Sequence, residues 1–337
     1  MRSRIFYLLA VIFLITVSCE KSSEESDLSI KIPKGFPAID FPEGNEFTEE
    51  RWKLGKRLFY DPILSVDSTI SCASCHKQAF AFSDNVPKSA GAMDRAGTRN
   101  APSLANLAYH PHFTREGAVP TLEMQVLVPI QEHNEFAFNI VEISEKLKKI
   151  DSYVSESQSA YGKEPDHFVI TRAIANFERS LISGNSPYDK YRFQGDADAL
   201  STLEKTGETL FFSERTSCSS CHSGFNFTNY TFENNGLYEE YDDPGRFRFT
   251  GEESDKAVFK VPSLRNVAVS APYMFDGSIK SLAEVISHYN AGGSSHINKN
   301  ELIRPLGLSD DEQEALLAFL MTLTDDSFIN DPKFRKE

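Results

Sequence analysis

The hydrophobic positions of this chain follow a helical spacing over most of its length. Between 168 and 181 the apolar side chains recur mostly three or four residues apart, as on one face of an α-helix. A second such face, 316–323, follows an acidic helix start at 309–312. The stretch 223–260 is rich in glycine, asparagine and aromatic residues and is expected to be a long loop. The pattern predicts a mainly α-helical fold with few short strands.

The pattern is also repeated within the chain. Helical segments around Gly55 and Gly207 each carry leucine and phenylalanine at the next apolar positions, and each glycine would allow a close helix crossing. Further along, the segment 102–106 reads PSLAN and 262–266 reads PSLRN, 160 residues apart. We therefore expect two helical domains related by internal duplication, at about 45–195 and 196–330.

Residues 1–19 have the pattern of an export signal. Arg2 and Arg4 precede an apolar run from 5 to 17, which is short for a membrane span, and the run ends at Ser18-Cys19. A cysteine after a small residue at this point indicates a lipoprotein processing site. An ordinary signal peptide or an uncleaved anchor is the alternative. Residues 20–44 are then expected to form a tether, so the protein would be periplasmic and lipid-anchored to a membrane.

The charge of the chain limits its partners. The formal net charge is −14, and removal of the two arginines in 1–19 leaves about −16, from 33 basic and 49 acidic residues. Such a balance argues against nucleic acid and anionic membrane surfaces as partners. It favours a basic protein partner, and it leaves open whether the protein forms a homodimer.

Two short strings carry the most specific chemistry. Cys72-Ala-Ser-Cys75-His76 and Cys218-Ser-Ser-Cys221-His222 are both C-x-x-C-H, the sequence used for covalent attachment of c-type haem. Two thiols one helical turn apart can bond to the two haem vinyl groups, and the adjacent histidine can bind the iron. A zinc-binding module is the alternative for a single string. Two strings after similar helices favour two haem c groups.

The repeat also allows the residues on the far side of the two haems to be compared. The helix after the second string contains His288 and Tyr289, both able to bind ferric iron, whereas the matching first-copy residues are Val128 and Pro129. We therefore expect the second haem to have a side-chain ligand on both faces and the first to keep an open face for peroxide. In the alternative reading, His288 or Tyr289 only packs against the helix.

From about residue 45 to 330 the chain resembles the bacterial di-haem cytochrome c peroxidase and MauG family. The matching motifs are the two haem strings, 54–62, 99–102, 122–125, 261–266 and Asp276-Gly277. The resemblance implies two cytochrome c-like domains, with a peroxidatic haem in the first and an electron-transfer haem in the second. It implies that hydrogen peroxide is reduced with electrons from a small c-type cytochrome or a cupredoxin, which enter through the second haem.

The resemblance also assigns residue roles. It places a family glutamine at Gln125 and the peroxidatic glutamate at Glu135, on the open face of the first haem. A carboxylate there can move the proton that O–O cleavage requires, and the alternative is that Glu135 is a surface acid. The resemblance further implies an interdomain Ca²⁺ ion, held by Asn100 and by the carbonyls of Ser270 and Pro272.

Three positions depart from the family pattern. Ala92, next to Met93, stands where many members carry a histidine that blocks the first haem. Arg115 stands near the position of the family tryptophan between the haems, and the only tryptophan here is Trp52. Tyr289 aligns with the distal methionine of typical peroxidases, as in the MauG branch. A MauG-like oxidase of a protein substrate, or a non-catalytic di-haem electron carrier, are therefore alternative functions.

Overall fold

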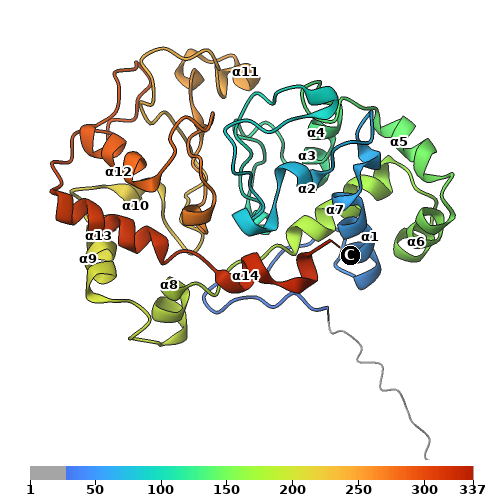
Figure 1. The fold of residues 1–337 in the computed structure, drawn as a ribbon, viewed down its shortest axis with the longest axis horizontal. Helices are drawn as coiled ribbons and strands as arrows, with labels where there is room; N and C mark the ends of the chain where they lie inside the picture. Colours follow the sequence, from blue (N-terminus) through green and yellow to red (C-terminus); the bar gives the residue numbers. More distant parts are fainter. Residues whose placement is uncertain (1–27, 337) are drawn as a thin grey trace, which may run out of the picture.

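The computed structural model describes residues 28–336, so the predicted signal 1–19 and Cys19 lie outside the described residues. The chain forms two helical halves side by side (Figure 1). The first half contains α1 (Glu49–Tyr60), α2 (Cys72–Cys75), α3 (Leu122–Gln125), α4 (Leu127–Gln131), α5 (Ile140–Leu147), α6 (Asp151–Tyr161) and α7 (His167–Arg179). The later elements are α8 (Pro187–Asp189), α9 (Thr202–Phe211), α10 (Cys218–Cys221), α11 (Phe247–Thr250), α12 (Leu282–Ala291), α13 (Asp310–Met321) and α14 (Asp326–Asn330).

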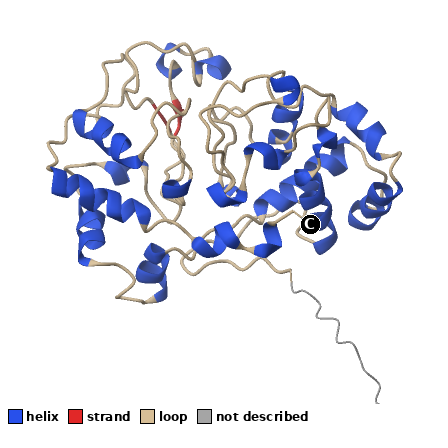
Figure 2. Cartoon of the chain, viewed as in Figure 1, coloured by secondary structure: helices blue, strands red, loops and turns tan. Residues whose placement is uncertain are grey.

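Helices and loops make up almost all of the described chain (Figure 2). The named strands are β1 (Phe232–Glu233) and β2 (Phe259–Lys260), which pair antiparallel and lie within the long loop region of the second half. The predicted mainly helical fold with few short strands is confirmed. None of the helices in residues 28–336 combines the length and the apolar character needed to cross a membrane.

Each half is built around a pair of helices whose backbones touch. A Cβ atom added to Gly55 of α1 would lie 1.9 Å from the carbonyl oxygen of Ala173 in α7. A Cβ atom added to Gly207 of α9 would lie at the same 1.9 Å from the carbonyl oxygen of Ala315 in α13. No real Cβ atom fits at that distance, so glycine is required at both crossings, as the repeated sequence predicts.

The duplication extends to the loops after each haem string. Asn106 and Asn266 both adopt left-handed backbone conformations, with φ of 62° and 59°, and each begins a short 3₁₀ helix. The Asn106 amide donates to the carbonyl of Leu181, and the Asn266 amide donates to the carbonyl of Leu323. Residues 160 positions apart in the two copies therefore have the same backbone conformation and hydrogen bonding as well as similar sequence.

The two halves exchange segments across the boundaries predicted from sequence. In α8, which lies within the predicted first domain 45–195, Tyr188 belongs to the core of the second half. Asp189 of the same helix forms a fully buried ion pair with Arg265, with N–O distances of 2.7 and 2.8 Å. The chain thus enters its second half before residue 196, because these side chains find their apolar and charged partners there.

The C-terminal end makes the reverse crossing. Phe328 of α14 and Phe334 pack into the core of the first half, and the Tyr60 hydroxyl donates to the Phe334 carbonyl at 2.6 Å. The segment is the red one that runs from the second half to α1 in Figure 1. The residues after α13 therefore pack against the first half.

The described part of the predicted tether also contacts both halves. The Phe36 ring lies 6.0 Å from that of Tyr109 in the first half and 4.6 Å from that of Phe225 in the second. The Arg265 guanidinium lies 4.6 Å from the centre of the Phe36 ring. Within the described residues, the predicted tether therefore packs against the folded halves through Phe36.

The glycine crossings lead to a stability prediction. Gly207→Ala should lower the free energy of unfolding by about 1–3 kcal/mol, the usual cost of overpacking a core. The loss should occur even though alanine favours a helix by about 1 kcal/mol over glycine, because the α9 and α13 backbones must separate. Denaturant unfolding of the haem-loaded protein measures the change.

Thr206→Ala is the matched control, since Thr206 is the exposed neighbour of Gly207 on the same helix. Its effect should stay within about 0.5 kcal/mol. Equal stability of the Gly207→Ala variant and the unmodified protein would contradict the backbone contact.

Candidate active site

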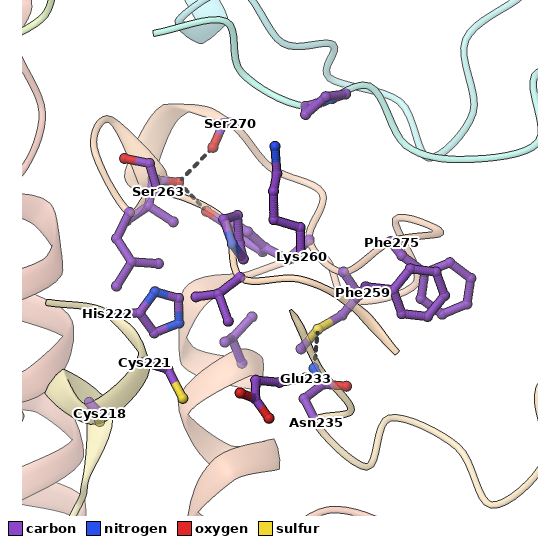
Figure 3. Close-up of a pocket in the computed structure, with 18 of the residues that line it drawn as sticks. Cys218, Cys221, His222, Glu233, Asn235, Phe259, Lys260, Ser263, Ser270 and Phe275 are labelled. Carbon is purple, nitrogen blue, oxygen red and sulfur yellow. Dashed lines mark hydrogen bonds between the residues drawn. The ribbon is translucent and has the colours of Figure 1, made fainter. Parts of the chain in front are cut away.

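The second haem string lies on a cavity between the two halves. Cys218, Cys221 and His222 line a cavity of about 390 Å³, together with residues of the first half such as Pro102 and Gln125. Figure 3 shows the two cysteines and the histidine on one side of this cavity, facing the loop that carries Phe259 and Lys260. The two cysteines are three residues apart on α10, so both thiols belong to one helical turn.

Both haem-string histidines are held by the same backbone contact. The Nδ1 atom of His76 lies 2.8 Å from the Phe82 carbonyl, and that of His222 lies 3.1 Å from the Phe227 carbonyl. Both phenylalanines have positive φ, 58° and 50°, which turns the carbonyl toward the ring. A proton on Nδ1 leaves the Nε2 lone pair free for a metal. Burial lowers the pKa of both histidines, which favours the neutral, ligating form.

The four cysteines of the two strings form no disulfide bonds in the part of the chain that the structure describes. Burial raises the pKa of the Cys72 and Cys75 thiols, and the charge of Glu135 adds a smaller contribution to both shifts. Reduced thiols one turn apart, next to a neutral imidazole with a fixed Nδ1, are the donor set that a covalently attached haem needs. The residues therefore fit a haem c group at each string.

Gln125 and Glu135 come from neighbouring elements of the first half. Gln125 ends α3 and lines the interdomain cavity, while Glu135 follows α4. The Glu135 residue keeps exposed surface, but the protein around its carboxyl group and, second, the charge of Glu132 raise the pKa of Glu135 to about 7. A carboxyl group with that pKa can both accept and return a proton near neutral pH.

The backbone of Glu135 is fixed by the loop that contains Ala92. The Ala92 amide donates to the Glu135 carbonyl at 2.8 Å. A Cβ atom on the preceding Gly91 would lie 2.1 Å from the Asn134 carbonyl oxygen, so the two segments are in direct contact. Sequence reasoning missed this contact, and the glycine before Ala92 was the available signal for it.

The Ala92 loop offers no strong iron ligand in this conformation. Ala92 is fully buried and carries only a methyl group, while Met93 is 55% exposed and its sulfur lies 3.4 Å from Arg95 Nη2. His110 lies elsewhere, with its ring nitrogens 3.4 Å from Asn226 Nδ2 and from Lys260 Nζ.

Tyr289 and His288 point to different surroundings on α12. Tyr289 lines the cavity with His222, and its hydroxyl accepts from Asn235 Nδ2 at 3.4 Å. His288 is bonded through Nε2 to the Asn235 carbonyl at 3.1 Å. The geometry brings the tyrosine, rather than the histidine, to the cavity of the second haem string.

Met274 is a cavity residue that sequence reasoning missed. Its sulfur accepts from Asn235 Nδ2 at 3.2 Å, so one carboxamide contacts both Met274 and Tyr289. Met274 has φ 76°, and Thr114, 160 residues earlier, has φ 63°. The equivalent loop position thus carries a sulfur-containing side chain only in the second copy.

The three predicted calcium ligands lie in the same region. Asn100, Ser270 and Pro272 all line the interdomain cavity. The Asn100 amide donates to the Phe275 carbonyl at 2.9 Å, so Asn100 does connect the two halves. Its side-chain oxygen accepts a hydrogen bond from Arg115 Nη2 at 3.1 Å.

The tryptophan is not between the two strings. Trp52 is buried in the core of the first half, 5.7 Å from the Phe177 ring, and its indole N–H donates to Ser180 Oγ at 2.7 Å. Arg115, which stands near the tryptophan position of the family sequence, lines the interdomain cavity.

The chain is similar to known proteins over most of its length. Residues 49–198 match the family model of di-haem cytochrome c peroxidase. The methylamine utilization protein MauG of Methylorubrum extorquens is 34% identical, over 85% of this chain and 81% of that protein. Cytochrome c551 peroxidase of Pseudomonas aeruginosa is 32% identical, over 83% of this chain and 80% of that protein.

A solved structure agrees with these sequence matches. A MauG-like protein associated with microbial copper homeostasis superposes with a TM-score of 0.86 at 35% identity, covering 91% of this chain and 98% of that one. The haem strings, the duplicated fold and the relatives lead to one conclusion: the chain belongs to the di-haem cytochrome c peroxidase family, which includes the MauG proteins.

Proposed function

We propose that this protein is a periplasmic di-haem peroxidase that reduces hydrogen peroxide to water. One haem c would be attached through Cys72 and Cys75 with His76 as its ligand. The other would be attached through Cys218 and Cys221 with His222 as its ligand. The observation that carries the proposal is the difference between the two copies. The charge of Glu135 acts on the Cys72 and Cys75 thiols of the first string, whereas Tyr289 lines the interdomain cavity with His222 of the second string. Gln125 of the first half also lines that cavity.

The stoichiometry of peroxide reduction defines which electrons and protons must reach the site. Each peroxide takes two electrons and two protons and gives two waters. Bound haem iron supplies the site at which the O–O bond is reduced. Glu135 would take the proton from the oxygen nearer the iron and return it to the leaving oxygen, and Gln125 would orient the peroxide by hydrogen bonding.

Electrons would enter through the second haem. A small c-type cytochrome or a cupredoxin is the proposed donor, and the net charge of −14 favours a donor with a basic docking face. A lipid anchor at Cys19 would keep the enzyme at a membrane, although Cys19 lies outside the described residues.

A MauG-like oxidation of a protein substrate is the second candidate. Tyr289 on the cavity and the MauG relatives favour it. The absence of tryptophan from the region between the strings argues against a shared high-valent state that uses this side chain, since Trp52 is in the core of the first half. Turnover of hydrogen peroxide with reduced cytochrome c, set against a protein-oxidation assay, separates the two functions.

The acid–base role of Glu135 gives the first functional prediction. Glu135→Gln should keep the fold and both haems while peroxide turnover falls by about 10²–10⁴-fold, the usual contribution of general acid–base catalysis. Steady-state turnover with reduced cytochrome c measures the loss. Near-normal activity would remove Glu135 from the mechanism.

Glu132→Gln is the matched control for that variant. Glu132 raises the pKa of Glu135, so its neutralisation should lower that pKa from about 7. The ionised form of Glu135 is the proton acceptor, and it dominates above its pKa. The acidic limb of the pH–rate profile should therefore move to lower pH in Glu132→Gln, while the activity at high pH is retained.

The Ala92 loop predicts that the enzyme needs no reductive activation. The oxidised protein as isolated should bind azide or cyanide at one haem and react with hydrogen peroxide without prior reduction. The optical and EPR spectra of the resting protein test this directly. Two six-coordinate haems in the resting spectrum would show that another residue, such as Met93 or His110, blocks the first site.

Tyr289 is proposed as the distal ligand of the second haem. Tyr289→Phe removes only the hydroxyl oxygen, so the packing should survive while the spectrum of that haem shifts and its reduction potential rises. His288→Ala is the control and should leave the spectrum unchanged. The reverse result would make the axial pair bis-histidine and would remove the main support for a MauG-like function.

A further inference from the structure

Arg115 joins the two halves of the molecule at the interdomain cavity. It lies in the loop that follows Phe113 in the first half, and its main-chain carbonyl accepts from the Lys260 amide of β2 at 2.7 Å. Its guanidinium turns back to Asn100. Nε lies 3.1 Å from the Asn100 carbonyl, and Nη2 lies 2.7 Å from that carbonyl and 3.1 Å from Asn100 Oδ1.

Asn100 uses all of its polar groups in this arrangement. Its amide donates across the interface to the Phe275 carbonyl at 2.9 Å, and its Nδ2 donates to the Val86 carbonyl at 3.2 Å. Both of its oxygens accept from Arg115. The Asn100 side-chain oxygen that would bind an interdomain metal ion is thus already occupied by a cationic donor.

We propose that the Arg115 guanidinium takes the place of the interdomain Ca²⁺ ion at Asn100, so that the oxygens of this interface residue are held by a cation belonging to the chain itself. The inference concerns how the haem domains are held together and goes beyond the proposed peroxidase reaction. It replaces the calcium site expected at Asn100, Ser270 and Pro272.

The Arg115 guanidinium and a Ca²⁺ ion at Asn100 would repel each other. A Ca²⁺ ion sits about 2.3–2.6 Å from its oxygen ligands. If Asn100 Oδ1 bound Ca²⁺ while keeping its 3.1 Å contact to Arg115 Nη2, the two positive charges would lie within about 6 Å of each other. Charges of like sign repel strongly at such a separation inside a protein. We therefore expect Asn100 to bind either the Arg115 guanidinium or Ca²⁺, and not both at once.

Nearby acids do not provide a free ligand set for calcium. Asp243 is paired through both carboxylate oxygens with Arg99, at 2.7 and 2.9 Å, and Glu116 is paired with the same arginine.

An arginine can bind the Asn100 oxygens that the Ca²⁺ ion would otherwise bind at this interface. The guanidinium is planar and offers several donors in a fixed arrangement, so one side chain contacts two oxygens of Asn100 at once. Burial lowers the pKa of Arg115 to about 10, which still leaves the group charged at neutral pH. Its side-chain bonds hold Asn100 in place, while the main chains of Asn100 and Arg115 make the bonds to Phe275 and Lys260 of the second half.

The first test is made on the unmodified, haem-loaded protein. Elemental analysis should find no stoichiometric calcium, and neither EGTA nor added CaCl₂ should change the melting temperature. The spectra of both haems should be equally insensitive. About one calcium per chain, together with a lower melting temperature in EGTA, would overturn the proposal.

Arg115→Gln provides the second test. The loss of the cation should lower the melting temperature, and the freed Asn100 oxygen should allow added CaCl₂ to restore part of it, with a dissociation constant on the order of 10⁻⁴–10⁻³ M. Arg192→Gln, at an exposed arginine of the same charge, should show neither effect.

The results of these two tests do not depend on whether the proposed peroxidase function is correct. A variant with an unchanged melting temperature and no response to calcium would contradict the proposal. If Arg115→Gln does not fold, the calcium content of the unmodified protein still decides the question. Melting temperature and metal content are measured without peroxide turnover, so failure of the proposed reaction would not affect either reading.

Discussion

The contact of two helix backbones, made once in each half, is the constraint on which the rest of the structure depends. Gly55 against Ala173 and Gly207 against Ala315 bring the helices so close that no side chain fits at either crossing. The haem string follows the first helix of each pair by a short connection, and the loop with Asn106 or Asn266 is bonded just beyond the second. Each pair therefore sets where the thiols, the histidine and the opposite loop can be.

The two copies keep this frame and differ where the chemistry differs. We propose that Glu135 and Gln125 act at the first string, whereas in the second half Tyr289 and Met274 line the cavity with His222. The second half also holds the buried pair of Asp189 and Arg265, and the residue matching Arg265 in the first copy is Ala105. Breaking such a buried pair typically costs about 3–5 kcal/mol, so α8 is firmly bound to the second half.

Much of this arrangement could be predicted from sequence because it rests on local spacing. The haem strings and the helix start at Ser309 depend on residues within one or two turns. The repeated glycines and the 160-residue offset identified the equivalent crossings and loops in the two copies. The crossings of α8 and α14 between halves could not be predicted, since they depend on which distant core accepts Tyr188 and Phe334. The bond from Arg115 to Asn100 was missed for a related reason, because a charged side chain gives no periodic signal of its partner.

The charge of Arg115 also affects the energetics of electron movement. Arg115 lines the same cavity as His222 and Gln125, and it stays protonated throughout the neutral range. A fixed positive charge in a region of low dielectric stabilises the reduced form of any redox centre beside it. The charge of Arg115 does not change near neutral pH. It would therefore favour reduction of a haem on either side of it without requiring that a proton be taken up with the electron.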